Sequence, residues 1–402
     1  MVMDFVGTRN LAARWFVTVI MRLIAALKGP VVCAECGQSV PASLAFDFVM
    51  GEGCCGKRKL RFAEARALPG WVLPARWVLL SLAIFAFIAV KAPIGVDYPI
   101  FKGAAMAWVH GESRLFDAAA PGFYYAPWSL LLYAPLAMLP DWLASTLLNT
   151  LSVLAIVWAV GQLVGPAPWW VTALAIANIW TVNLVGSTQF DALTLGAVGV
   201  GWLALQRRRP WMLGLAWAVI GAKPTNAWLP ALLLLAMTFT EGWSWKTRLQ
   251  AAVLPLICVI AAFVIGGQDW PARYLAFVRQ SPPNAGYNLA AGIGQWLTIG
   301  LFLWPLFFHI RDHGLDGVAL ALALGLNLLL SPYVTIYHYV LSIPLMVRSG
   351  ARDSLWLVFL YVASLAWVMV RPLLPIYPVA LGIAVMACYI QDYRVLVMAQ
   401  QQ

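Results

Sequence analysis

Long apolar stretches separated by short polar ones follow one another from residue 71 to near the end of the chain. A stretch of about 17 or more apolar residues can cross a lipid bilayer as a helix. Twelve crossings are predicted, although several stretches are shorter than that length: 71–92, 142–163, 168–185, 190–206, 211–222, 225–239, 251–266, 295–310, 315–330, 335–347, 354–370 and 374–390. The pattern therefore predicts an all-α integral membrane protein, with a polytopic domain over residues 69–402.

The N-terminal region has a different pattern. Over residues 1–30 the apolar positions recur at helical spacing while Arg14 and Arg22 fall on another face, which predicts an amphipathic helix along the membrane surface. The polar segment 31–68 contains four cysteines: Cys33, Cys36, Cys54 and Cys55. These two groups are similar to the knuckles of a zinc ribbon, with Glu52 where a cysteine would be expected. Structural zinc is one interpretation, reduced thiols in a cytoplasmic linker are another, and a redox role is a third.

Basic residues between the apolar stretches predict the orientation of the chain, because loops rich in Lys and Arg stay in the cytoplasm. A basic group within residues 57–66 precedes the first stretch and places the N-terminal region inside. The later basic positions are Arg207, Arg208, Arg209, Lys246, Arg248, Arg311, Arg348, Arg352 and Arg394. All of them share one side only if segment 127–139, about 13 residues long, does not cross. Both ends of the chain are then cytoplasmic, and 127–139 is a half-inserted or surface helix of the first outer loop.

Composition narrows the classes of function. The chain is 62% hydrophobic and only 10% charged, which is far from the composition of a soluble domain. Its formal charge of +10 is spread over short clusters, so no nucleic-acid partner is expected, and the excess is explained by topology and contact with membrane lipids. The sequence contains no Walker loop, no dinucleotide-binding fingerprint and no metalloprotease helix motif. Soluble nucleotide chemistry therefore has no support.

Asp97 opens a polar loop directly after the first apolar stretch, on the predicted outer side. A carboxylate in that place is a candidate general base for chemistry on lipid-linked substrates. The alternative is a structural one, in which Asp97 caps a helix from Tyr98 to Val109 that has Pro99 in its first turn. Both roles can coexist, because a carboxylate at a helix start is expected to have a lowered pKa and to stay ionised.

Two cations on the predicted outer side are candidates for binding a phosphate. Lys223 stands before Pro224, which breaks a long apolar stretch and frees backbone groups, as in the interrupted helices that line cavities. The alternative for Lys223 is an ammonium that extends to the membrane interface. Arg371 lies on the outer side against the orientation rule, which suits either a substrate phosphate or a lipid headgroup.

Three further polar residues have both a functional and a structural interpretation. Gln189 and Asp191 follow a predicted outer turn, where either could contact a sugar hydroxyl or satisfy the end of a helix. His338 stands among aromatic residues, where a hydrogen-bonded core histidine is the alternative to a functional one.

Several short blocks of the sequence together resemble a known family. They are Asp97 to Ala105 continuing to His110-Gly111, Phe123 to Pro127 continuing to Ala134-Pro135-Leu136-Ala137, the Gln189 turn, Lys223-Pro224, and Ser331-Pro332 with His338-Tyr339. In order and spacing the chain resembles the polytopic GT-C glycosyltransferases, in particular the family 87 type related to polyprenol-phosphate-mannose-dependent mannosyltransferases. Ala126 departs from the family, which usually has the first of two prolines there.

The resemblance implies a GT-C-like arrangement and an inverting transferase of the cell envelope. Such an enzyme takes a hexose, mannose in the related enzymes, from a polyprenyl-phosphate-sugar donor and passes it to a lipid-linked or glycan acceptor on the periplasmic or extracytoplasmic face of the cell membrane. Asp97 would be the base and His338 would lie near the donor or acceptor. The expected substrate contacts are Tyr98, Lys102, Tyr125, Gln189, Lys223, Arg371 and Tyr339. No cofactor is required for catalysis, because the donor carries its own activation.

A transporter or lipid flippase is the alternative from a different class. Twelve spans and a broken helix would also suit such a protein. Against it, the two halves of the chain show no obvious repeat, and the polar residues gather on one predicted face.

Overall fold

The computed structural model describes residues 72–91, 94–111, 123, 125–280, 293–331, 334–370 and 376–400, together with three short strands nearer the N-terminus. The chain divides into two compact units, 1–80 and 81–402. In the first unit β1 (Val31–Cys33) pairs antiparallel with both β2 (Ser39–Val40) and β3 (Leu60–Phe62), so the strand order is β2-β1-β3. This small sheet adds to the all-α fold predicted from the sequence.

Part of the N-terminal prediction lies outside the described residues. The amphipathic helix over residues 1–30 belongs to that part, as do Cys36, Cys54 and Cys55. Cys33 is the last residue of β1. Zinc binding by these four cysteines therefore stays a prediction.

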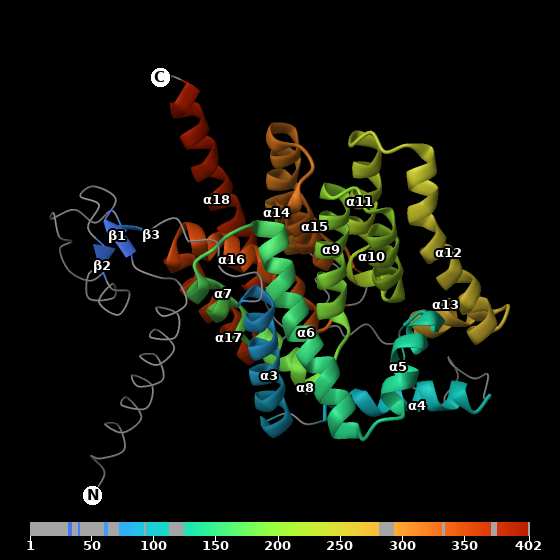
Figure 1. Ribbon diagram of the computed structural model, residues 1–402. Helices are drawn as coiled ribbons and strands as arrows, with labels where there is room; N and C mark the ends of the chain where they lie inside the picture. The colour runs from blue at the N-terminus through green and yellow to red at the C-terminus, as the bar shows by residue number, and fades with distance from the viewer. Residues whose placement is uncertain are drawn as a thin grey trace, which may run out of the picture. The chain divides into compact units, whose positions relative to one another are not determined.

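From residue 72 onward the described elements are helices, and each predicted apolar stretch coincides with one helix or a pair (Figure 1). The α-helices are α3 (Val72–Lys91), α4 (Tyr98–Val109), α5 (Leu130–Ala137), α6 (Asp141–Val164), α7 (Trp169–Ile176), α8 (Ile179–Ser187), α9 (Asp191–Gln206), α10 (Pro210–Ala222), α11 (Trp228–Thr240), α12 (Trp245–Gly266), α13 (Trp270–Gln280), α14 (Ile293–His313), α15 (Gly317–Leu330), α16 (Ile343–Arg352), α17 (Ser354–Val370) and α18 (Ile376–Gln400). In the described parts of the chain, 3-10 helices join them at η1 (Pro127–Ser129), η2 (Pro224–Asn226) and η3 (Ile336–Ser342).

The lengths of these helices support a membrane protein. Among the described residues, α6 and α12 are long and apolar enough to cross a bilayer, and the bent pair α7 and α8 would make a third crossing if it is one span. Several shorter apolar helices accompany them. Helix α5 has 8 residues and is about 12 Å long, well short of the ~30 Å hydrocarbon core. The protein is therefore an integral membrane protein, while the number of twelve spans stays a prediction.

The predicted span 168–185 is not one continuous helix. Helices α7 and α8 meet at an angle of 52°. Asn178 stands at the break, where its side-chain oxygen accepts hydrogen bonds from the backbone N–H groups of Trp180 and Thr181. Because an asparagine that caps a new helix competes with continuation of the old one, the chain turns here. The turn directs the end of α8 toward the loop that contains Asp97.

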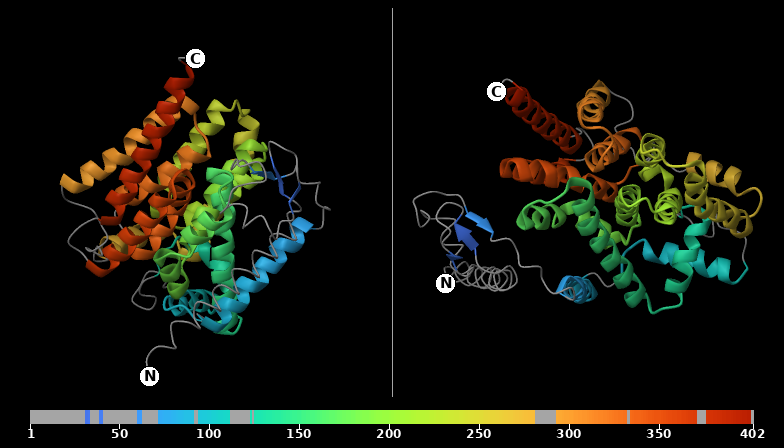
Figure 2. Two further views of the ribbon diagram at one scale, coloured as in Figure 1. Left: turned by 90° about the vertical axis from the view of Figure 1, so that its left-hand side faces the viewer. Right: turned by 45° about the horizontal axis from the view of Figure 1, so that its top comes forward.

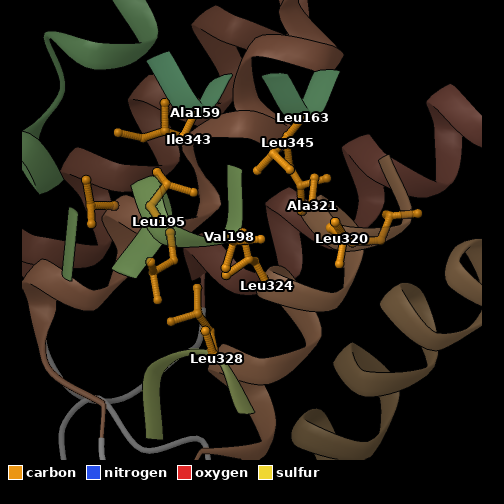
Figure 3. Close-up of a cluster of buried hydrophobic side chains, with 14 of the residues drawn as sticks. Ala159, Leu163, Leu195, Val198, Leu320, Ala321, Leu324, Leu328, Ile343 and Leu345 are labelled. Carbon is orange, nitrogen blue, oxygen red and sulfur yellow. The ribbon is translucent and has the colours of Figure 1, made fainter. Parts of the chain in front are cut away.

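The core of unit 81–402 lies where α9 packs between α6 and α10, with α15 and α16 on the neighbouring side. Figure 3 shows this cluster, in which Ala159 and Leu163 of α6 lie near Ile343 and Leu345 of α16. The α10 and α12 helices are also in close contact, and they run side by side in Figure 1 and Figure 2. A Cβ at Gly214 of α10 would lie 2.5 Å from the carbonyl oxygen of Ala251, so only glycine permits this approach.

The basic turns lie at one end of this bundle. Helices α6 and α9 run in the same direction, because a Cβ at Gly196 would face Ala155 and one at Gly199 would face Ala159. Their C-terminal ends therefore lie together, and Gly317 at the start of α15 packs against the last turn of α6. The Arg208 guanidinium donates to the Glu241 carbonyl, which adds the α11–α12 turn to the same end. In Figure 1 this turn points upward, while α4, α5 and α13 lie at the bottom.

Candidate functional site

Asp97 stands at the end of the bundle opposite the basic turns, directly before the first residue of α4. Two backbone hydrogen bonds fix its loop to the last turn of α8: Val96 N to Gly186 O at 3.0 Å, and Asp97 N to Ser187 O at 3.3 Å. The predicted helix Tyr98–Val109 is confirmed with the same bounds, but the Asp97 side chain makes no capping hydrogen bond. The carboxylate instead accepts a hydrogen bond from the Gln189 amide. Asp97 is therefore not committed to the structural role of a cap.

Gln189 is held from its other side by Tyr125. The Tyr125 hydroxyl donates to Gln189 Oε1 at 2.7 Å, which leaves the amide nitrogen to face Asp97. Tyr125 is buried and belongs to a group of aromatic rings with Phe101, Phe123, Tyr133 and Phe190. The packed ring group thus positions Tyr125, whose hydroxyl orients an amide that contacts the candidate base.

The pKa of Asp97 is raised above its ordinary value of 3.8. Burial is the main cause, because it disfavours the charged form, while the Gln189 hydrogen bond and the positive charge of Lys223 act in the opposite direction. The sequence-based expectation of a lowered pKa was therefore wrong. The reason is that the half-buried carboxylate loses water without gaining the backbone hydrogen bonds of a helix cap.

A second group of polar residues, made up of Asp191, Asn226 and Lys223, is buried. Asp191, the first residue of α9, accepts a hydrogen bond from Asn226 Nδ2 at 2.7 Å and forms an ion pair with Lys223 at 3.1 Å. Lys223 directly follows the last residue of α10, at the predicted break before Pro224, which the structure confirms as a 3-10 turn. The Lys223 ammonium also lies 5.2 Å from the ring centres of Tyr125 and Tyr337. The cation is thus enclosed by a carboxylate and two aromatic faces, and it does not extend to the membrane interface.

His338 joins this group from η3. Its Nδ1 accepts a hydrogen bond from Thr335 N at 3.0 Å, within a capping box at the start of η3. That bond places the ring proton of a neutral histidine on Nε2, which lies 3.5 Å from Asp191 Oδ1. His338 therefore has the predicted structural role of a hydrogen-bonded core histidine, and it also lies beside the ion pair of Asp191 and Lys223.

The other predicted substrate contacts are engaged elsewhere or lie outside the described residues. The Tyr98 hydroxyl donates to Leu136 O at 3.3 Å, and Lys102 forms an ion pair with Asp141 at 2.5 Å. Tyr339 is buried among the rings of Trp180, Trp367 and Tyr377. Arg371 lies outside the described residues. The structure thus brings Asp97, Tyr125, Gln189, Lys223 and His338 together at one end of the bundle.

Reasoning from the sequence did not identify Asn226 as a site residue. It also did not identify Asp191 as the partner of Lys223. A usable signal existed, because Asp191 and Glu241 are the only acidic residues between positions 142 and 268. A lysine buried in that stretch needs one of them as a counter-ion. Among the described residues no three His, Cys, Asp or Glu side chains gather as metal ligands.

A comparison with protein-family models gives the class of protein. The model for glycosyltransferase family 87 matches residues 123–399, which is more than half of the chain. The chain belongs to glycosyltransferase family 87. It is therefore a glycosyltransferase. The family 87 match includes Tyr125, Gln189, Asp191, Lys223 and His338, whereas the loop with Asp97 precedes it. Searches of curated proteins and of solved structures found no match.

Proposed function

We propose that this family 87 protein is an inverting hexosyltransferase that uses a polyprenyl-phosphate sugar, with mannose as the hexose. Its acceptor is a lipid-linked or glycan hydroxyl at the outer face of the cell membrane. The observation that carries the proposal is the Asp97 carboxylate, which is half-exposed, free of a capping role and oriented by Gln189. Family membership supports the transfer of a sugar, and the apolar helices support a lipid-borne substrate.

In the proposed reaction Asp97 is the general base. It takes the proton of the acceptor hydroxyl while that oxygen forms a bond to the anomeric carbon of the donor sugar. The bond from the anomeric carbon to the phosphate oxygen breaks on the opposite face, and its electron pair leaves with the polyprenyl phosphate. The sugar is thereby inverted, and the proton ends on Asp97. Because the phosphate is already a good leaving group, the step requires no cofactor.

Binding of the donor phosphate requires a positively charged residue. The contacts of Lys223 limit how that residue can serve. Lys223 is the predicted phosphate ligand, but in the structure Asp191 occupies its ammonium at 3.1 Å. A donor phosphate that binds there has to share Lys223 with Asp191 or replace that carboxylate. Arg371 remains the second predicted phosphate ligand. In either arrangement the cations stabilise charge that develops on the leaving phosphate, which is a large term in many transferases.

The proposal is tested by supplying purified protein in detergent with radiolabelled polyprenyl-phosphate-mannose. The acceptors are short alkyl mannosides and a membrane lipid extract, offered in parallel. We expect labelled product whose anomeric configuration, determined by NMR, is opposite to that of the donor. Polyprenyl-phosphate-glucose and nucleotide-linked mannose serve as competing donors. Transfer from the nucleotide sugar alone would overturn the polyprenyl donor, transfer of glucose alone would overturn mannose, and retention would overturn the inverting reaction.

The Asp97→Asn variant tests the base. General-base catalysis contributes about 10² to 10⁴ in rate, so we expect turnover to fall by that factor while donor binding persists. Asp269→Asn is the matched control, because Asp269 is a carboxylate with a 68% exposed side chain just after α12, outside the polar group around Asp97. Near-wild-type turnover of the Asp97 variant would exclude Asp97 as the base. A fall of the same size in both variants would do so as well.

A further inference from the structure

Thr188 has an unusual backbone conformation at the junction between α8 and α9. Its φ of 54° and ψ of 56° place it in the left-handed region. A β-branched residue is rarely found there, since its branched Cβ crowds the backbone, and such conformations persist only where surrounding contacts impose them. Thr188 is fully buried, and the next residue in the chain is Gln189.

The contacts that impose this conformation involve the Thr188 hydroxyl. It lies 2.9 Å from Ser145 Oγ and accepts a hydrogen bond from Asn149 Nδ2 at 3.1 Å. Asn149 also donates to Val185 O at 3.0 Å, in the last turn of α8. Two residues one turn apart on α6 therefore hold both the side chain of Thr188 and the helix end that precedes it.

The same contacts reach the Asp97 loop. Gly95 N donates to Ser145 Oγ at 3.1 Å. A Cβ at Gly95 would overlap the Thr188 hydroxyl, so only glycine allows the loop to pass this closely. Ser145 thus connects the Asp97 loop to Thr188, while Gln189, one residue further on, reaches the Asp97 carboxylate.

We propose that Thr188 is a positioning residue for sugar transfer: its hydroxyl, held by Ser145 and Asn149, keeps the chain in the left-handed turn that presents the Gln189 amide to Asp97. The inference deepens the proposed function and rests on Asp97 being the base. Thr188 itself touches neither substrate nor the reacting atoms. Its effect is on the geometry and the charge of the base.

Loss of the Gln189 hydrogen bond is expected to change the pH dependence of the reaction, which a general loss of protein stability would not do. That bond lowers the pKa of Asp97, against the rise caused by burial. The other charged group that acts on Asp97 is Lys223, from the break after α10, and behind it lie Asp191 of α9 and His338 of η3. Tyr125, the titratable partner of Gln189, comes from the segment before η1. When only the Gln189 bond is weakened, the acid limb of the pH–rate profile moves to higher pH.

The experiment compares Thr188→Val, which removes the hydroxyl at nearly constant shape, with Thr188→Ser, which keeps it. Misplacement of about 1 Å can reduce a rate by on the order of 10²-fold. We expect Thr188→Val to lose kcat to that extent, with the KM for polyprenyl-phosphate-mannose within about threefold, and with the acid limb at higher pH. Thr188→Ser is expected to restore both kcat and the acid limb. Thr238→Val is the control, because the hydroxyl of buried Thr238 donates to Leu235 O in its own helix.

A second variant keeps the test informative if the valine protein does not fold. Thr188→Ala also lacks the hydroxyl, and its unbranched Cβ crowds a left-handed backbone less than the Cβ of valine does, so it is expected to fold and to show the same loss of kcat and the same displaced acid limb. Wild-type kcat and an unmoved acid limb in Thr188→Ala would overturn the positioning role. That result would leave the proposed function intact, whereas absence of transfer by the wild-type protein would overturn the proposed function itself.

Discussion

Two opposing influences act on the charge of the Asp97 carboxylate. Changes to single residues can separate them. Burial raises its pKa, while the Gln189 amide and the Lys223 charge favour the ionised form. A base has to be ionised to accept a proton, so transfer is expected to decline as the pH falls through the pKa of Asp97. Because that pKa lies above 3.8, the decline begins at a higher pH than for an exposed aspartate.

The Gln189→Ala variant tests this directly. Without the amide one of the two groups that favour ionisation is lost, so the pKa of Asp97 rises further and the acid limb of kcat/KM against pH moves upward. The control is Asn183→Ala in the preceding helix α8, where the side-chain amide donates to Ile179 O. An acid limb that stays in place in Gln189→Ala, or one that moves equally in Asn183→Ala, would contradict the assignment of the limb to Asp97.

At the scale of elements, the ion pair of Asp191 and Lys223 joins the start of α9 to the break after α10. Its side chains are 0% and 3% exposed. Removing one partner of a buried pair leaves an uncompensated charge and costs roughly 3–5 kcal/mol, whereas removing both is often nearly neutral. We therefore expect Lys223→Met to be strongly destabilised and Asp191→Asn/Lys223→Met to recover most of the loss. Asn is the replacement for Asp191 because it retains an acceptor for Asn226.

Thermal unfolding in detergent of the wild type, Lys223→Met, Asp191→Asn and the double variant measures this double-mutant cycle. The ion pair of Asp269 and Arg273, whose side chains are 68% and 27% exposed, gives the reference, where Asp269→Asn is expected to cost about 0–1 kcal/mol. Equal stability of Lys223→Met and the double variant would show that Asp191 is not the partner that holds Lys223. Recovery of stability without recovery of transfer would separate the structural contribution of the pair from the contribution of Lys223 to the reaction.

The positions of the helices could be predicted from the sequence, whereas most of the junctions between them could not. Apolar runs locate the helices, and Pro224 and Pro99 locate a break and a helix start, because proline excludes most other conformations. The bend at Asn178 was missed, since the run 168–185 is otherwise apolar. The contact of Gln189 with Asp97 joins residues 92 positions apart, and it depends on a left-handed threonine that no local preference favours. Such contacts arise from packing of α6, α8 and the loop together.

At the scale of unit 81–402, charge is distributed unevenly between the two ends of the bundle. The end opposite Asp97 has the α9–α10 turn with Arg207, Arg208 and Arg209, the α11–α12 turn, and the ends of α14 and α16. There Arg348 pairs with Asp392 at 3.0 Å, and the Tyr389 hydroxyl donates to Asp312 at 3.3 Å. Basic turns favour the cytoplasmic side, so the orientation we propose has Asp97 facing outward and this end facing inward.

Cysteine labelling tests that orientation. In a protein whose native cysteines are replaced by serine, Asp269→Cys places a thiol after α12 at the Asp97 end, and Glu241→Cys places one in the α11–α12 turn. Both positions are exposed. We expect a membrane-impermeant maleimide added to intact cells to label the first and to label the second only after permeabilisation. The opposite pattern would place Asp97 on the cytoplasmic face and would overturn the proposed orientation. It would leave the transfer reaction standing, because the chemistry of Asp97 depends on its contacts with Gln189 and Lys223 and not on the compartment that supplies the acceptor.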